Sequence, residues 1–227
     1  MEGSRLELGN PIGDAISRVQ FAPKSNNLLI SSWDSFLRLY DVDGSSLRVQ
    51  ALSEGALLDC CFQDESLSLS ASSDGCIRRY DLYSGAQSII GKHDNAATCV
   101  EYSDGTGQFL DQSKSSAMGC VFRYHPKLKE RKNHLVAVND MAFHPRFDTF
   151  VTGDNEGYAI IWDAQSRKKL YEFQRYSNSV ACLSYNHIGQ LLAVASGHTY
   201  QEANEVEEAP QIFLHKTENL GRLKSTE

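Results

Sequence analysis

Short apolar runs alternate with turn-forming residues along most of the chain. In 28–42 (LLISSWDSFLRLYDV) an apolar run leads into a Ser-Ser-Trp-Asp corner, and a second run of alternating residues then ends on Tyr-Asp. The same order of parts returns in 67–82 (LSLSASSDGCIRRYDL) and in 150–164 (FVTGDNEGYAIIWDA). No window holds the sustained i, i+3, i+4, i+7 spacing of a long amphipathic helix, so the pattern predicts an all-β fold.

A recurring aromatic residue sets the length of the repeat. Phe21, Phe62, Tyr102, Phe143 and Tyr185 each end an apolar run, and successive members lie 41, 40, 41 and 42 residues apart. A period of about 40–45 residues with four strands per unit is typical of a β-propeller blade, which is stabilised by stacking on its neighbours. In the first unit, from the inside outward, we expect strands at 16–21, 28–33, 36–41 and 46–53.

The corners carry suitable turn residues. The Asp-Gly pair in 73–75 (SDG) tolerates the positive φ angles of a tight hairpin, and 155–157 (NEG) supplies glycine at a comparable place. Asp41, Asp81 and Asp163 end the third run of their units. We interpret these three aspartates as turn-forming residues rather than catalytic acids.

Composition places the chain among ordinary folded proteins, with 41% hydrophobic and 22% charged residues in 227. A formal net charge of −7 argues against broad attraction to nucleic acid or anionic lipid. No apolar run approaches the roughly 20 residues of a membrane-spanning helix. The N-terminal sequence lacks the features of a secretory signal, so we expect an intracellular protein.

The sequence offers no catalytic chemistry. Its six cysteines are scattered through apolar runs without a C-x-x-C pair, so we expect buried free thiols rather than a zinc or redox site. We find no nucleophile–base–acid arrangement and no phosphate loop in the sequence. We therefore expect no enzyme, no cofactor and no metal.

Several segments resemble the Bub-three family of mitotic checkpoint WD-repeat proteins, and in particular a divergent plant-type member. The similarity covers most of residues 5–216. Its most specific parts are SSWD followed by RLYDV, and RYSNS followed by ASGHTY. The resemblance implies a seven-bladed propeller that performs no chemistry. It also implies a location in the nucleus and at kinetochores, with a cytoplasmic pool.

The resemblance implies two kinds of partner. One face of the family's ring binds a short peptide motif of checkpoint kinases and pseudokinases, and the same face reads phosphorylated repeats of a kinetochore scaffold. We expect no membrane contact and no direct contact with nucleic acid. The alternative function is that of a messenger-RNA-export adaptor of the Rae/Gle type, which would bind a nucleoporin peptide through the same face.

Four residues are candidates for binding the kinase-borne peptide. Trp33 leads them, because a tryptophan at a loop corner supplies apolar area and an indole N–H. Packing between blades is the alternative for Trp33. Asp34 belongs to the same corner, and Arg175 and Tyr176 lie in a turn that resembles one on the family's binding face.

Three basic residues are candidates for binding a phosphopeptide. Arg123 falls where the family has a basic residue facing the phosphorylated repeat, and a guanidinium suits bidentate phosphate binding. Lys127 and Lys129 follow in a basic loop of an otherwise acidic protein. A solvated charged loop is the alternative.

The sequence departs from the family pattern near residues 107–108. After 98–107 (TCVEYSDGTG) a second strand and a corner should follow, but 108–134 instead resemble the third and outer strands of the family's fifth blade. Roughly two and a half blades are missing by comparison with the family's propeller. We therefore expect an incomplete WD-repeat β-propeller of four regular blades and one hybrid, in which residues 103–120 are the least regular part.

We expect a single propeller domain over residues 1–227, with a disordered tail at 216–227. A propeller closes by combining strands from both chain ends. We therefore expect 6–10 (LELGN) to pair as an outer strand of the final blade.

Overall fold

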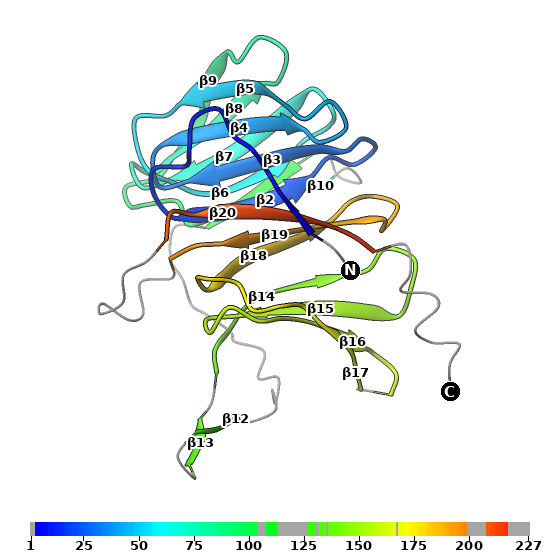
Figure 1. Ribbon diagram of the computed structural model, residues 1–227. Coiled ribbons are helices and arrows are strands. Elements are labelled where there is room, and N and C mark those ends of the chain that lie inside the picture. Colours follow the sequence, from blue (N-terminus) through cyan, green and yellow to red (C-terminus); the bar gives the residue numbers. More distant parts are fainter. Residues whose placement is uncertain are drawn as a thin grey trace.

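The protein is built from short β-strands, as the computed structural model in Figure 1 shows. The structure describes residues 3–103, 108–112, 127–129, 132–134, 136–166, 168–198 and 208–217. Over these ranges the chain forms strands, turns and bends, and no helix that could cross a membrane is found in them. The all-β prediction is confirmed.

Four antiparallel sheets of four strands form the regular blades. The blades are numbered along the chain, and number 3 is kept for the hybrid unit, which is described below. Blade 1 contains β2 (Ile16–Phe21), β3 (Asn27–Ser32), β4 (Phe36–Asp41) and β5 (Ser46–Leu52). Blade 2 contains β6 (Leu57–Phe62), β7 (Leu67–Ser72), β8 (Cys76–Asp81) and β9 (Gln87–Lys92). Blade 4 contains β14 (Val138–Phe143), β15 (Thr149–Asp154), β16 (Ala159–Asp163) and β17 (Lys169–Glu172). Blade 5 contains β18 (Val180–Tyr185), β19 (Leu191–Ser196), β20 (Gln211–Lys216) and β1 (Gly3–Arg5).

The aromatic markers end the first strand of each regular blade, as predicted. Phe21, Phe62, Phe143 and Tyr185 are the last residues of β2, β6, β14 and β18. The second strands are buried almost throughout because neighbouring blades cover both of their faces. The outer strand β5 alternates between buried and exposed residues, since one of its faces meets water.

The blades stack in the order 4, 5, 1, 2. Strand β18 packs against both β14 and β2, β2 packs against β6, and β6 packs against β10 (Cys99–Ser103). Figure 1 shows blades 1 and 2 overlapping in the upper part of the view, blade 5 beneath them and blade 4 below blade 5. The described sheets form an open arc rather than a closed ring.

The two chain ends meet in blade 5. Strand β1 pairs antiparallel with β20, with Gly3 opposite His215 and Arg5 opposite Phe213. The expected strand therefore exists, but it is formed by residues 3–5 rather than 6–10. Leu6 still donates its N–H to Ile212 O at 2.8 Å, and its side chain is buried in the core between blades 5 and 1. Residues 7–10 lie beyond the paired segment.

Apolar clusters fill the spaces between the blades. Between blades 5 and 1, the inner-strand residues Val19 and Phe21 pack with Cys182, Ala193 and Ile212. Similar clusters join blade 1 to blade 2 and blade 4 to blade 5. Because complete burial of one large apolar side chain stabilises by about 1.5–3 kcal/mol, each blade depends on its neighbour for most of its apolar burial.

Hydrogen bonds between first strands reinforce each of these joints. A backbone N–H on one first strand donates to a side chain on the first strand of the adjoining blade. The four bonds are Phe21 N–H to Ser184 Oγ (3.1 Å), Phe62 N–H to Gln20 Oε1 (3.0 Å), Val100 N–H to Asp59 Oδ2 (3.0 Å) and Leu183 N–H to Asp140 Oδ2 (2.7 Å). These N–H groups are available because alternate residues of an edge strand point away from the ladder.

The hybrid unit differs in part from its prediction. Strand β11 (Gln108–Gln112) pairs antiparallel with β10, so QFLDQ forms a second strand where we expected none. Strands β12 (Lys127–Lys129) and β13 (Lys132–His134) form a separate hairpin, which projects from the stacked sheets in Figure 1. Residues 104–107 and 113–120 lie outside the described residues, so the expected irregularity of 103–120 stays a prediction.

The proposed tail also lies almost entirely outside the described residues. Its first residue, Lys216, ends β20, and Thr217 is the last residue described at this end of the chain. The disorder of the remainder stays a prediction, as does the single domain over 1–227.

A corner glycine provides a test of this architecture. Gly157 has φ +87°, and a Cβ at this position would lie 2.6 Å from the carbonyl oxygen of Tyr176. We expect Gly157→Ala to lower the free energy of unfolding by about 1–3 kcal/mol, because both the backbone and the contact become strained. Gly9→Ala is the matched control, since its Cβ would meet nothing within 4 Å. Equal stability of the two variants in denaturant titrations would contradict the assignment.

Candidate functional site

The corners between second and third strands lie beside the loops that enter the next blade. Backbone bonds join the two kinds of segment: Ser53 N–H to Ser35 O (2.8 Å), His93 N–H to Gly75 O (2.9 Å) and Tyr176 N–H to Gly157 O (2.9 Å). We call the surface formed by these segments the corner-loop face. It comprises residues 11–15, 33–35, 53–56, 73–75, 93–98, 155–158, 173–179, 197–198 and 208–210.

Trp33 is an exposed aromatic residue on the corner-loop face. Its side chain is 38% exposed, and its backbone N–H donates to Ala15 O at 2.9 Å. The neighbouring residues are held firmly: Ser32 is buried, and Asp34 is bonded on several sides. The corner therefore presents a large ring at the surface from a fixed backbone.

Asp34 has a structural role beneath that ring. Its carboxylate accepts two bonds from Arg38, Nη2 to Oδ2 at 2.7 Å and Nη1 to Oδ1 at 3.0 Å. It also accepts the N–H groups of Gly13 (3.0 Å) and Phe36 (3.1 Å), and the hydroxyl of Ser32. Burial alone would raise the pKa of this carboxyl, but the bonds from Arg38, Ser32 and Gly13 outweigh it, so the pKa lies below its usual range. The oxygens that we expected to face a peptide are already engaged within the blade.

Blade 2 repeats this arrangement without the tryptophan. Asp74 pairs with the buried Arg78 and accepts the Ser72 hydroxyl, and its pKa is lowered chiefly by the bond from Arg78. Ser73 occupies the place of Trp33. The aspartate–arginine pair therefore stabilises the corner of both blades, whereas the residue before the aspartate differs between them.

Arg175 and Tyr176 point in different directions. Arg175 is exposed, donates from Nε to Glu156 O at 2.8 Å and lies 5.9 Å from the ring centre of Tyr158. Tyr176 is only 7% exposed, and its hydroxyl hydrogen-bonds His215 Nε2 at 2.6 Å. Arg175 can contact a bound peptide, whereas the buried ring of Tyr176 has no direct access to one in this structure.

A pocket of about 290 Å³ lies on the corner-loop face, lined by Ile12, Gly13, Asp14, His198, Glu208, Ala209 and Pro210. Gly13 joins it to the corner of Trp33 through Asp34, and Asn178 Nδ2 joins it to the loop of Arg175 by donating to Glu208 O at 2.8 Å. The pocket therefore lies between the two accessible candidates.

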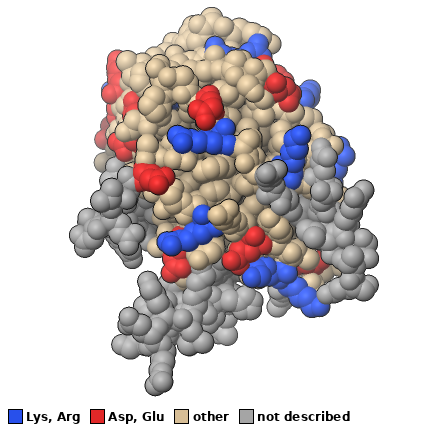
Figure 2. Space-filling view, viewed as in Figure 1, with Lys and Arg blue, Asp and Glu red and all other residues tan. Residues whose placement is uncertain are grey.

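Charge on this face is predominantly acidic. Figure 2 shows acidic side chains along the left edge of the view. The charged residues of the corner-loop face are Arg175 and the acidic Asp14, Asp34, Glu54, Asp74, Asp94, Glu156 and Glu208. Asp34 and Asp74 are neutralised by Arg38 and Arg78. Glu54, 87% exposed, lies 3.6 Å from the guanidinium of Arg78, which already pairs with Asp74. A bound segment that carries positive charge would be favoured electrostatically here.

The phosphopeptide candidates cannot be placed in one site. Arg123 lies outside the described residues, and Lys127 and Lys129 are the two ends of β12 in the projecting hairpin. This hairpin forms a sheet of its own, separate from the blades that carry Trp33 and Arg175. The proposed phosphate contact stays a prediction.

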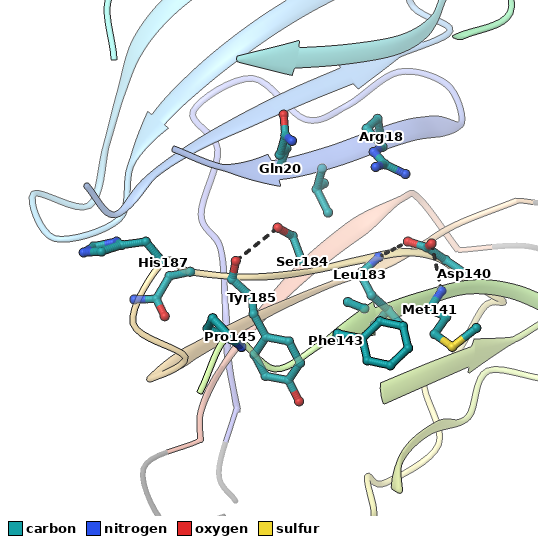
Figure 3. Close-up of a pocket in the computed structure, with 13 residues that line it drawn as sticks. Arg18, Gln20, Asp140, Met141, Phe143, Pro145, Leu183, Ser184, Tyr185 and His187 are labelled. Carbon is teal, nitrogen blue, oxygen red and sulfur yellow. Dashed lines mark hydrogen bonds between the residues drawn. The ribbon is translucent and has the colours of Figure 1, made fainter. Parts of the chain in front are cut away.

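A second pocket, of about 330 Å³, lies on the inner wall of the arc (Figure 3). Its residues come from β2, β18 and β14 and from the turns that follow the last two strands. Asp140 is prominent in it, and burial raises the pKa of its carboxyl despite two bonds from backbone N–H groups. Sequence reasoning missed this site, although carboxylates in otherwise apolar first strands were a visible signal.

The prediction of buried free thiols holds for four of the five described cysteines, and the fifth, Cys99, is free but only half-buried. Cys60, Cys61, Cys76 and Cys182 are buried and free, and burial raises the pKa of the Cys61 thiol to about 12. A raised pKa disfavours the reactive thiolate. Over the described ranges, no group of three His, Cys, Asp or Glu side chains could hold a metal ion.

The two residues of the corner have separable effects on stability. Asp34→Ala leaves Arg38, which is 2% exposed, without its ion-pair partner, and we expect a loss of about 3–5 kcal/mol in the free energy of unfolding. Trp33→Ala should cost less than about 1.5 kcal/mol because its ring is partly exposed. Chemical denaturation measures both. A larger loss for Trp33→Ala would show that the ring is mainly a packing residue.

The Asp74–Arg78 pair should make stability depend on pH. The folded pKa of Asp74 is depressed below the unfolded value of about 3.9, so its contribution is complete above that value and declines as the pH falls. We therefore expect Asp74→Asn to destabilise strongly near pH 6 and less near pH 3. Asp59 and Asp140, whose pKa values are raised by burial, affect the pH dependence of stability in the opposite direction. Their effect is the same in the unsubstituted chain and in Asp74→Asn, so it cancels in the comparison. A difference independent of pH would contradict the pairing.

Comparison with known proteins agrees with this architecture. The sequence model of the WD domain, G-beta repeat, matches residues 8–41 and 126–163. The chain is 38% identical over 313 residues to mitotic checkpoint protein BUB3.3 of Arabidopsis thaliana, covering 95% of this chain and 100% of the relative. It is 28% identical over 316 residues to BUB3.1 of the same plant, covering 94% and 93%. A more distant relative is the poly(A)+ RNA export protein of Schizosaccharomyces pombe, 21% identical over 315 residues with 92% and 90% covered.

These alignments contain a long gap. They extend over more than 310 residues, whereas the chain has 227, so an internal portion of the relatives has no counterpart here. This agrees with the missing blades inferred from the break in the repeat.

Proposed function

Because the chain belongs to the BUB3 family of mitotic checkpoint WD-repeat proteins, we propose that it is a non-catalytic scaffold whose corner-loop face binds a short peptide of a checkpoint kinase or pseudokinase. The observation that carries this proposal is Trp33, a 38% exposed residue in a corner that is fixed by the ion pair of the next residue, Asp34, with the buried Arg38. A rigid aromatic residue beside a pocket is a common anchor for a bound peptide.

The adjoining features suit an extended ligand. The 290 Å³ pocket lies between Trp33 and Arg175, so a peptide crossing it would contact two blades and the loop before β2. Asp34 and Tyr176 support this surface from below, one by fixing the corner and the other by its bond to His215. Arg175 supplies an exposed donor at the far end.

Affinity should be lower than that of a complete ring. A closed seven-bladed propeller would present further loops opposite Trp33, and the open arc lacks them. Each lost contact of about 1–2 kcal/mol lowers the affinity by roughly fivefold to thirtyfold.

Substitution of Trp33 tests the proposal. We expect Trp33→Ala to weaken binding of a synthetic kinase-borne peptide by at least about tenfold, because the anchor is removed. Isothermal calorimetry with the full chain measures this change, and Tyr83→Ala, which removes a 77% exposed ring in the β8–β9 turn, is the control. Equal loss in both variants, or no loss in Trp33→Ala, would overturn the assignment.

A second partner, the phosphorylated repeats of a kinetochore scaffold, is proposed on the strength of the family resemblance alone. Arg123, Lys127 and Lys129 would supply the positive charge. Kinetochore and nuclear location, with a cytoplasmic pool, belongs to the same proposal.

The competing function, an RNA-export adaptor that binds a nucleoporin peptide, is favoured only by the more distant export relative. Co-purification from mitotic cells separates the two functions, since it recovers checkpoint kinases in one case and nucleoporins in the other.

A further inference from the structure

The inner-wall pocket has a place in the arc unlike that of any other surface. Its floor is the free edge of β18, with β2 on one side and β14 on the other, as Figure 3 shows. In a closed ring such edges face a narrow channel lined by all the blades. Here the described sheets form an open arc, so the wall can be reached from the side.

Among the described sheets, none stands upstream of β14, whereas each other regular first strand has an upstream blade. Phe21, Phe62 and Leu183 donate their N–H groups to side chains of an adjoining blade. Phe143 has the same position in blade 4 as Phe21 has in blade 1. In both blades the N–H of the following residue bonds to the second-strand side of the hairpin: Ala22 N–H to Asn27 O, and His144 N–H to Thr149 O. The Phe143 N–H therefore points away from β15, on the side where the described arc ends.

Apolar side chains are exposed at the same place. Phe143 is 68% exposed and Met141 is 39% exposed, and both line the pocket. In the other first strands the corresponding aromatic residues are largely covered, with Phe21 at 6% and Phe62 at 7% exposure. Exposed apolar area of this kind on an otherwise polar surface is typical of an interaction site.

The charge of this wall is unbalanced toward negative. Arg18 and Asp140 both line the pocket and lie near each other. Arg18 also faces Asp59 and Glu101, each at 3.8 Å, on the inner strands beyond the pocket, so one guanidinium is shared among three carboxylates. Asp140 accepts one N–H at each oxygen, from Met141 (2.8 Å) and Leu183 (2.7 Å). A carboxylate has about four acceptor positions, so Asp140 can accept further bonds from a bound cation.

We propose that this inner-wall groove binds an extended peptide segment of a partner protein that carries an arginine next to an apolar residue. A carbonyl of the segment accepts the Phe143 N–H, as Ser184 and Gln20 accept the equivalent groups in other joints. The guanidinium pairs with Asp140, and its alkyl stem lies across Phe143 and Met141. The proposal does not depend on the corner-loop face.

A second copy of this chain fits the groove less well. A copy that extended the arc would present its other open end, where β10 (CVEYS) carries Glu101 and no basic residue. That side chain is 62% exposed, so it would bring negative charge against an acidic wall. Charge complementarity therefore favours a basic segment of another protein.

Three labelled peptides test the proposal with the full chain. The first, acetyl-Ser-Val-Thr-Arg-Val-Thr-Ser-amide, is the probe, and the other two replace arginine with citrulline or glutamate. In fluorescence anisotropy we expect saturable binding of the arginine peptide, about tenfold weaker binding of the citrulline peptide, and weaker binding still of the glutamate peptide. Absence of saturable binding, or equal binding of the three, would overturn the proposal.

Protein variants locate the binding. Phe143→Ser should weaken the arginine peptide by about tenfold, whereas Tyr83→Ser, which also removes an exposed ring, should leave it unchanged. Asp140→Asn should reduce the preference for arginine over citrulline. Because Asp140 also holds Leu183, the Phe143 variant and the citrulline peptide carry the test if Asp140→Asn fails to fold.

Sedimentation of the unliganded chain tests the other occupant. A concentration-dependent dimer that Phe143→Ser abolishes would assign the groove to a second copy and overturn the proposal. Indifference of the arginine peptide to Phe143→Ser would overturn it as well.

Discussion

Each regular blade is held by hydrogen bonds and apolar contacts between its first strand and the blade beside it. The edge of a first strand points half of its N–H groups away from its own sheet, and an unpaired buried N–H costs about 1–3 kcal/mol. A serine, a glutamine and two aspartates of neighbouring strands accept these groups, while apolar clusters close around them. The repeat length of about 40 residues reflects this contact, because each repeat places one first strand at the contact with the neighbouring blade.

The same dependence explains where the molecule is open. Blade 4 packs against blade 5 on one side, but in the described structure no sheet stands in the upstream position. Phe143 and Met141, which would face such a neighbour or the channel, are exposed for that reason. The surface available for new contacts is thus a consequence of the shortened repeat array and not of a specialised loop.

The sequence predicted the regular blades well because their signals are local and repeated. The markers from Phe21 to Tyr185 located the first strands, and the exposed position of Trp33 followed from its corner. The prediction was weaker where the partner of a residue is distant or easily overlooked. The predicted peptide contact of Asp34 stays a prediction, but its carboxylate already pairs with Arg38, and the recurrence of this spacing in Asp74 to Arg78 was a signal for such an internal pair.

Other features could not be read from the chain. The burial of Tyr176 depends on His215, which lies 39 residues away on another blade. The second strand of the hybrid unit was missed because QFLDQ lacks the apolar pattern of the other second strands, and it pairs with β10 nonetheless. The inner-wall pocket is formed by three strands, β2, β14 and β18, that meet only in the assembled arc.

Residue-resolved amide hydrogen exchange of the unliganded chain tests the dependence of blades on their neighbours most directly. The account predicts slow exchange at Phe21, Phe62 and Leu183, whose N–H groups are held by an adjoining blade. It predicts fast exchange at Phe143, which occupies the strand position of Phe21 and Phe62 but has no upstream sheet in the described structure. Protection of Phe143 equal to that of the other three would contradict it, because the contact between blades would then not be what protects these amides.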